Sequence, residues 1–300
     1  MKSIVIFLQN RNFFGAQIVH LPLIKALKVK YPDYQIILFS KYPIAKVLEP
    51  FVNEVFIETS RWKSFQKYRS MNPNISINLR KRSWLINGYI TLFNTHKKIG
   101  FCSWLTKRFF DQCTQHDTQI YRAQNYLNLI HESLIYEEHK KHTRIAIIPG
   151  AGEQFKTYPI AKFIELATKL KKRYPENEIV FILGKNEKHM QENIGSKFKI
   201  YYELDALALF EVIQNSKLII ANDCGPSHIA QISNSANIIL YSNEKQNAHS
   251  VIKEWFNPKE NAKYLLSDQG KKIDSIEVKS IFNTTTKLLD QYSFAAKTEA

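Results

Sequence analysis

The stretch KLIIANDCGPSHIAQI, residues 217–232, joins an apolar run to a polar cluster and then to a second apolar segment. Residues 217–221 have the composition of a buried strand, whereas residues 228–232 begin a helical pattern. The polar cluster between them therefore lies at the carboxyl end of a strand and at the start of a helix. Ligands bind at this position in open α/β sheets. The stretch thus predicts a parallel sheet with a ligand site at residues 222–228.

Short apolar runs alternate with helical patterns on both sides of this stretch. In the second half, strands are predicted at 144–150, 178–184 and 236–242, and helices at 158–175, 205–216 and 275–292. The first half opens with a strand-helix-strand pattern at 3–8, 18–32 and 35–40, followed by candidate strands at 53–58 and 74–79. Two such halves predict the α/β class, with two Rossmann-like doubly wound domains that face each other across a ligand-binding cleft.

The polar segment 136–143 is the expected linker between the two domains. We assign residues 1–140 to the first domain and residues 144–300 to the second. The terminal helix, 275–292, is expected to pack back onto the first domain. Two histidines in the linker, His139 and His142, are not accompanied by carboxylates or cysteines at a recognised metal-ligand spacing, and no metal is expected.

The composition excludes several classes of protein. Three cysteines in 300 residues are too few for a disulfide framework, so a reducing cytoplasm is the expected compartment. The segment MKSIVIFLQNRNFF predicts a first strand rather than a signal peptide, and no apolar run approaches the length of a membrane span. Glycine motifs typical of dinucleotide-binding proteins, P-loop proteins and α/β-hydrolases are absent from the sequence.

Positive charge is concentrated in the first half of the chain. The formal net charge is +15, and residues 1–143 carry 21 Lys and Arg against 9 Asp and Glu. Residues 61–122 alone carry 12 basic and 2 acidic residues. This asymmetry indicates an acidic partner, which could be nucleic acid, an anionic membrane surface or a phosphorylated acceptor.

Four segments of the sequence resemble segments of one protein family, and they occur in the same order as in that family. ANDCGPSHIAQI is similar to the Asn-Asp-Ser-Gly-Pro-x-His signature of the ADP-heptose lipopolysaccharide heptosyltransferases, glycosyltransferase family 9. IIPGAGEQFKTYPIAKFIELATKL, FILGKNEKH and FFGAQIVHLPLIKALKVKYPD are similar to three further segments of that family. The resemblance covers about residues 4–58 and 144–242 and implies the GT-B fold.

The resemblance implies a donor site for a nucleotide-diphosphate sugar in the second domain. A helix N-terminus offers free N–H groups and the positive end of a dipole to a pyrophosphate. Lys156, in the position of the family lysine, would neutralise the leaving diphosphate in the transition state. The implied donor-binding residues are Lys156, Thr157, Glu187, Asp223, Gly225, Pro226, Ser227 and His228, with the backbone N–H groups of Ser227 and His228 directed at phosphate.

The first loop departs from the family at Ala16. The family has an aspartate there that is taken to be the general base, and alanine cannot accept a proton. His20 is the candidate replacement, because the pKa of a histidine lies near neutrality. Its other interpretation is a packing or capping residue at a helix start. The implied acceptor-binding residues are Asn10, Arg11, Gly15 and Gln17.

The resemblance implies an inverting glycosyltransferase that extends a lipopolysaccharide or lipooligosaccharide core. The sequence contains no Asp-x-Asp pair, so metal-independent transfer is expected, with a nucleotide sugar as co-substrate and no cofactor. The expected partners are the nucleotide sugar, an anionic lipid A core and the inner face of the inner membrane, where the protein would be peripheral.

Two alternatives stay open at this point. A catalytically inactive nucleotide-sugar-binding homologue would explain Ala16. A nucleic-acid-binding protein would explain the basic region 61–122 with its interleaved aromatic residues Trp62, Tyr68, Trp84 and Tyr89, although nucleic acid is not an expected partner.

Overall fold

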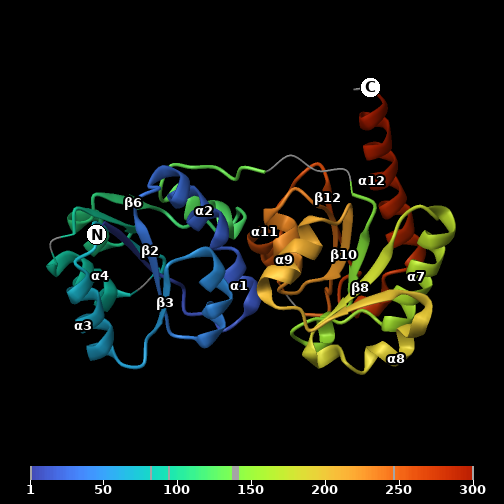
Figure 1. Cartoon of the computed structure of the whole chain (residues 1–300), viewed down its shortest axis with the longest axis horizontal. Coiled ribbons are helices and arrows are strands. Elements are labelled where there is room, and N and C mark those ends of the chain that lie inside the picture. Colours follow the sequence, from blue (N-terminus) through green and yellow to red (C-terminus); the bar gives the residue numbers. More distant parts are fainter. Residues whose placement is uncertain (1, 82, 94, 137–141, 246, 299–300) are drawn as a thin grey trace. The chain divides into compact units, whose positions relative to one another are not determined.

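The computed structural model describes residues 2–81, 83–93, 95–136, 142–245 and 247–298, with side chains as far as residue 291. The chain forms two compact units, Met1–Ile135 and Tyr136–Ala300. Each unit contains one six-stranded parallel sheet with helices against it (Figure 1). The α/β class and the parallel sheets predicted from the sequence are confirmed.

The sheet of the first unit has the strand order β3-β2-β1-β4-β5-β6. Its strands are β1 (Ser3–Phe7), β2 (Gln35–Ser40), β3 (Glu54–Ile57), β4 (Ile75–Asn78), β5 (Lys97–Phe101) and β6 (Gln112–Thr114). Its helices are α1 (Phe14–Ile18), α2 (Leu21–Lys30), α3 (Arg61–Met71), α4 (Trp84–Leu92), α5 (Trp104–Phe109) and α6 (Arg122–Asn128), with a 3-10 helix at Pro43–Phe51.

Apolar side chains of β1 and β2 pack beneath α3 and α4 in the first unit. The core there contains Val5, Phe7, Ile37, Phe39, Tyr68, Ile86 and Ile90. Capping serines fix where the two helices begin: Ser60 Oγ accepts a hydrogen bond from the N–H of Lys63, and Ser83 Oγ accepts one from that of Ile86. Both helices therefore start at the carboxyl edge of the sheet.

The sheet of the second unit has the order β12-β11-β10-β7-β8-β9. Its strands are β7 (Ile145–Ile148), β8 (Ile179–Leu183), β9 (Lys199–Tyr202), β10 (Leu218–Asn222), β11 (Ala236–Tyr241) and β12 (Ala262–Leu266). Its helices are α7 (Ile160–Arg173), α8 (Met190–Ile194), α9 (Ala206–Gln214), α10 (Ser227–Ile232), α11 (Ala248–Trp255) and α12 (Val278–Thr298).

Helix α12 packs on α7 and β11 within the second unit (Figure 1). Its residues Ile281, Leu288 and Leu289 belong to the core of that unit. The return of this helix to the first domain stays a prediction. The predicted linker contains residues 137–141, including His139, which lie outside the described residues.

One predicted helix differs from the structure. Residues 18–32 were expected to form a single helix, whereas the chain forms α1 and α2 with a break at Val19 and His20. Proline 22 lies in the first turn of α2, where its missing N–H costs no helical hydrogen bond. The break places Ala16 and Gln17 inside α1 and His20 at the junction.

None of the described helices combines the length and apolarity needed to cross a bilayer. In the same part of the chain, no three His, Cys, Asp or Glu side chains are grouped as metal ligands.

Candidate functional site

The topology of the second sheet marks where a ligand site would form. The chain runs from β7 outward to β8 and β9, then returns to β10 on the other side of β7 and continues to β11 and β12. The order of strands therefore reverses between β7 and β10. Crevices at such switch points, at the carboxyl ends of the strands, are the ligand sites of doubly wound sheets.

Asn222, the last residue of β10, is hydrogen-bonded to the loop that follows β7. Its Nδ2 donates to the carbonyl oxygen of Pro149 at 2.7 Å, and its Oδ1 accepts from the N–H of Tyr158 at 3.3 Å. Tyr158 is buried and donates from its hydroxyl to the carbonyl oxygen of Ile276. The loop that carries Lys156 is therefore held at both ends.

Lys156 and Asp223 meet at this switch point. Lys156 Nζ lies 2.7 Å from Asp223 Oδ2 and 3.8 Å from Glu153 Oε2. The Lys156 side chain is 27% exposed and that of Asp223 is 11% exposed. An ammonium group in this setting stays accessible to an anionic ligand, while a carboxylate balances its charge in the free protein.

Glu187 lies beside the start of the loop that carries Lys156, where it contacts Gly150. Its Oε2 accepts a hydrogen bond from the N–H of Gly184 at 3.0 Å. A Cβ atom added at Gly150 would lie 2.8 Å from Glu187 Cδ, so the carboxylate packs directly on the glycine backbone. Burial, followed by the charges of Asp223 and Glu187, raises the pKa of the Cys224 thiol to about 12. Asp223 and Glu187, the two acidic residues predicted for the donor site, therefore both lie near enough to Cys224 for their charges to act on its thiol.

The turn at Gly225–His228 makes hydrogen bonds of its own. The N–H of His228 donates to the carbonyl oxygen of Gly225 at 3.1 Å, and Ser227 Oγ donates to that of Cys224 at 2.8 Å. Pro226 is the N-cap residue of α10. The tight turn before α10 uses the His228 N–H internally, and the contact of the Ser227 and His228 N–H groups with phosphate stays a prediction.

The His228 ring is part of a buried network rather than a freely presented group. Its Nδ1 lies 3.1 Å from Gln231 Nε2. Gln231 Oε1 in turn accepts from the N–H of Asn257, whose Nδ2 donates to Tyr136 Oη. This network fixes α10 against the segment that follows α11.

Sequence reasoning missed two residues beside Lys156. The Phe155 ring lies 5.7 Å from Lys156 Nζ and 3.7 Å from Lys245 Nζ. Lys245 follows β11 and brings a second cation to the same edge of the sheet. In the sequence, the position of Lys245 shortly after a predicted strand was the feature that could have identified it as a site residue. Thr157 Oγ1 donates to the carbonyl oxygen of Glu153.

The first sheet has its own switch point, between β1 and β4. The loop after β1 carries the predicted acceptor residues. Asn10 and Arg11 are exposed, whereas Gly15 and Gln17 are buried in α1. Gln17 Nε2 donates to the carbonyl oxygen of Arg11 at 2.6 Å, which ties the loop to the helix.

His20 lies in the interior of the first unit. Its ring stacks on Tyr126 with centroids 4.8 Å apart, and its Nδ1 lies 3.1 Å from the carbonyl oxygen of Gln17. Burial lowers the pKa of this histidine to about 3. The ring is therefore neutral at physiological pH and has no exposed surface from which to reach an acceptor hydroxyl. This placement argues against His20 as the general base.

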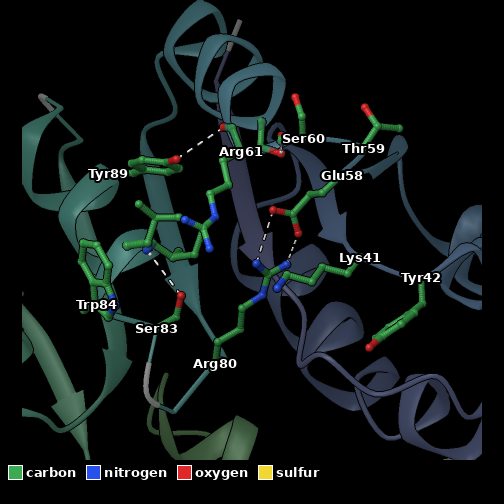
Figure 2. Close-up of a pocket in the computed structure, with 13 residues that line it drawn as sticks. Lys41, Tyr42, Glu58, Thr59, Ser60, Arg61, Arg80, Ser83, Trp84 and Tyr89 are labelled. Carbon is green, nitrogen blue, oxygen red and sulfur yellow. Dashed lines mark hydrogen bonds and ion pairs between the residues drawn. The ribbon is translucent and has the colours of Figure 1, made fainter.

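A cavity of about 520 Å³ opens at the carboxyl edge of the first sheet. It lies where β2, β3 and β4 end and where α3 and α4 begin (Figure 2). Its lining includes Lys41, Glu58, Arg61, Arg80, Trp84 and Tyr89. None of these residues was predicted as a site residue, because they come from three separate segments, which follow β2, β3 and β4.

The glycosyltransferase family 9 (heptosyltransferase) model matches residues 51–274 of the chain. This match covers about three-quarters of the 300 residues. The chain belongs to glycosyltransferase family 9. None of the curated proteins matches the sequence.

Solved structures of the same family share the fold of this family 9 chain. A family 9 glycosyltransferase from Veillonella parvula is 17% identical, with 97% of this chain and 98% of that chain covered and a TM-score of 0.72. The E. coli ADP-heptose lipopolysaccharide heptosyltransferase II is 16% identical, with 98% and 100% covered and a TM-score of 0.71. E. coli heptosyltransferase WaaC with ADP is 13% identical, with 95% and 99% covered and a TM-score of 0.69. The GT-B fold implied by the sequence is confirmed.

Proposed function

We propose that this family 9 protein transfers a sugar from a nucleotide-diphosphate donor, with ADP-heptose favoured, to a lipopolysaccharide or lipooligosaccharide core. The observation that carries the proposal is the Lys156–Asp223 pair at the switch point of the second sheet. This pair places a partly exposed ammonium group where doubly wound sheets bind nucleotides. E. coli WaaC, which shares the fold, has been solved with ADP.

Lys156 would act on the leaving diphosphate. The acceptor hydroxyl oxygen attacks the anomeric carbon from the face opposite the diphosphate, the bond from that carbon to the phosphate oxygen breaks, and the hydroxyl proton passes to water. The electron pair stays on the diphosphate, so negative charge grows there as the bond lengthens. An ammonium group at that position stabilises the transition state more than the ground state. In this proposal Lys156, with Lys245 nearby, supplies this stabilisation without a metal, and the nucleotide sugar is a co-substrate.

Glu187 and the backbone around Gly150 would hold the nucleoside. The Glu187 carboxylate packs on Gly150, next to the loop that carries Lys156. A carboxylate there can accept hydrogen bonds from ribose hydroxyls, while Asp223 is placed to accept them from the donor sugar once Lys156 turns to the phosphate. Thr157, Gly225, Pro226, Ser227 and His228 would shape the rest of the donor site.

The first unit would receive an anionic, lipid-linked acceptor. Residues 1–143 carry an excess of 12 positive charges. Trp62, Trp84 and Trp104 are 64%, 76% and 77% exposed. Each lies in the first turn of a helix that follows β3, β4 or β5, so all three stand at the carboxyl edge of the sheet. Exposed tryptophan with surrounding cations favours a membrane interface, which supports a peripheral position on the inner membrane.

A second candidate function follows from Ala16. The acceptor hydroxyl must give up its proton, alanine cannot accept it, and His20 is buried against Tyr126. This combination favours a homologue that binds nucleotide sugars without turning them over. The two candidates share the donor site and differ only in turnover.

The test of the shared donor site is thermal stabilisation by ADP-, UDP-, GDP- and dTDP-sugars. A ligand that binds only the native state raises its apparent stability. We expect ADP-sugars to raise the melting temperature of the wild type and to have little effect on the Lys156→Ala variant. Lys169→Ala is the matched control, because Lys169 lies exposed on α7 and pairs with Glu165 at the surface. If no nucleotide sugar stabilises the wild type, the proposed function is wrong.

A further inference from the structure

We propose that Cys102 and Cys113 form a reversible oxidation site in the first unit, where a small disulfide such as glutathione disulfide joins the two thiols to each other. Cys102 directly follows β5, and Cys113 is the middle residue of β6. The third cysteine of the chain, Cys224, lies in the second unit. The inference does not depend on the proposed function, because it concerns residues of the first unit only and its test involves no sugar or nucleotide.

The register of β5 and β6 places the two cysteines on one face of the sheet. Gly100 pairs with Cys113, and the N–H of Cys102 donates to the carbonyl oxygen of Thr114 at 2.9 Å, which continues the ladder by one residue. Side chains alternate between faces along a strand, so Cys102 lies on the same face as Gly100 and therefore as Cys113. Because Gly100 has no side chain, no side chain of β5 separates the two thiols.

A hydrogen bond joins the two thiols. Burial, followed by this hydrogen bond and by the charge on the Cys113 thiol, raises the pKa of the Cys102 thiol to about 11, while the charge of Lys107 acts in the opposite direction. The sulfur atoms are therefore already neighbours in the reduced protein.

Closure of the disulfide needs only a small movement of β6. Diagonal neighbours across a pair of strands are roughly 7–8 Å apart at Cα. A disulfide usually needs Cα atoms within about 7 Å of each other. Strand β6 has three residues, all only partly buried, and it lies at the edge of the sheet. Such an element can shift at little cost, because few buried contacts hold it.

The pair is accessible, whereas Cys224 is not. Cys102 and Cys113 are both partly exposed, and Cys224 is buried. An oxidant in solution can therefore reach the pair and leaves Cys224 unreacted. All three cysteines are free thiols in the structure. Disulfides near the surface are the ones that glutathione reduces again, so the bond is reversible where glutathione sets the redox balance.

The reaction consists of two thiol–disulfide exchanges. The Cys113 thiol gives its proton to water, and its sulfur attacks one sulfur of glutathione disulfide, whose S–S bond breaks and releases one glutathione thiolate. The Cys102 thiol then gives up its proton and attacks the Cys113 sulfur of the mixed disulfide, which releases the second glutathione. Two cysteine thiols are oxidised, and one glutathione disulfide is reduced to two glutathione molecules. The first attack is assigned to Cys113 because the Cys102 thiol holds its proton strongly.

The disulfide fastens the least buried edge of the first sheet. It closes the segment 103–112, which contains α5, and it joins β6 to β5 by a covalent bond. A cross-link of this kind removes open conformations of the segment that it closes. Helix α5 carries the exposed Trp104 and the basic residues Lys107 and Arg108. Oxidation therefore restricts the movement of a cationic part of the surface.

The test is mass spectrometry of the full chain after incubation with glutathione disulfide at a fixed concentration of reduced glutathione. The reaction is stopped with acid, and remaining thiols are alkylated under denaturing conditions. Trypsin cleaves after Lys107 and Arg108, so the two cysteines fall on separate peptides, residues 99–107 and 109–122. The variants Cys102→Ser and Cys113→Ser each remove one thiol of the pair. Cys224→Ala is the matched control, because it removes the cysteine outside the pair.

We expect the oxidised wild type to lose the mass of two hydrogen atoms, to keep one thiol for alkylation and to give the two peptides as a linked pair. Cys224→Ala should close the same disulfide at the same glutathione disulfide concentration. Each serine variant can form only the mixed disulfide with glutathione. Half-conversion of these variants should need at least about tenfold more glutathione disulfide, because the second exchange in the wild type is intramolecular.

Trypsin digestion of the folded protein measures the effect on the edge of the sheet. Cleavage after Lys107 and Arg108 should be slower in the oxidised wild type than in the reduced one, and dithiothreitol should restore the faster rate. The proposal is overturned if the wild type retains glutathione instead of closing the disulfide, if Cys224 or a second chain supplies the linked peptide, or if cleavage is equally fast in both forms.

Discussion

Replacement of Lys156 by alanine should weaken the binding of ADP by roughly tenfold. In the free protein the lysine ammonium lies 2.7 Å from the Asp223 carboxylate. A diphosphate that binds here must replace this partner. The variant removes the cation that the diphosphate would gain and leaves the carboxylate to repel it.

The magnitude follows from two opposing effects. A hydrogen bond to a charged group contributes about 1.5–3 kcal/mol. Lys156 is 27% exposed and already paired, so the net gain on exchanging Asp223 for phosphate falls at the lower end of this range. A loss of about 1.4 kcal/mol corresponds to a tenfold change in Kd.

Asp223→Asn provides the complementary measurement. The amide keeps the size of the side chain but removes the charge that competes for Lys156. We expect this variant to bind ADP as tightly as the wild type or more tightly. With an ADP-sugar it should lose part of the additional affinity that the sugar provides, because the proposed hydrogen bonds from sugar hydroxyls to the carboxylate are weakened.

Isothermal titration calorimetry at fixed ionic strength and 25 °C measures these affinities. Calorimetry is preferable to melting temperature here, because loss of the Lys156–Asp223 pair also changes the stability of the free protein. Lys169→Ala should match the wild type. The reasoning is refuted if Lys156→Ala binds ADP within twofold of the wild type, or if Asp223→Asn weakens ADP binding as much as Lys156→Ala does.

Three further changes test other parts of the account. Gly150→Ala places a methyl group against the Glu187 carboxylate and should weaken nucleoside binding in calorimetry, whereas Gly152→Ala, with no atom within 4 Å of its new Cβ, should not; equal affinities would contradict the role of Glu187. Ala16→Asp restores a proton acceptor and should raise turnover of a donor and acceptor pair by about 10²-fold or more if a missing base limits the rate, with a lower melting temperature because the site is buried. The pKa of His20 is about 3 in the folded protein against 6.5 when exposed. Between these pH values the unfolded state binds more protons than the folded state, so the free energy of unfolding falls as the pH decreases from about 6.5 toward 3. His20→Gln should reduce this pH dependence in urea unfolding curves, and an unchanged dependence would show that other groups cause it.

The sequence predicts the second sheet well because its strands are uniformly apolar. Strands β7, β8, β10 and β11 are buried along their whole length, so each appears as a continuous apolar run between polar segments. Helix α7 has a clear apolar face against the sheet, and basic residues fill its last turn. Here local composition and tertiary burial point to the same structure.

The region from β5 to α6 could not be assigned from the sequence. Strand β6 has three residues, all only partly buried, and the first two residues of β5 are lysines. Helix α5 has six residues. Elements this short contain too few residues to establish a period, and their conformation depends on pairing with β4 and on packing.

The candidate sites depend on contacts between distant residues. Lys156 and Asp223 are 67 positions apart, and they meet because β7 and β10 are neighbours at the switch point. His20 is buried by Tyr126, more than a hundred positions away, so its exposure could not be judged from the sequence. The cavity of the first unit draws Lys41, Arg61 and Arg80 from the ends of three strands, and no local pattern connects them.

The measurement that tests the central claim most directly is release of ADP from ADP-heptose, with and without a deacylated anionic core oligosaccharide. The account predicts release that depends on the acceptor, becomes slower in Lys156→Ala, and is unaffected in Lys169→Ala. No release in the presence of the acceptor, although ADP-heptose binds, would contradict the assignment as an active glycosyltransferase and would establish the non-catalytic alternative.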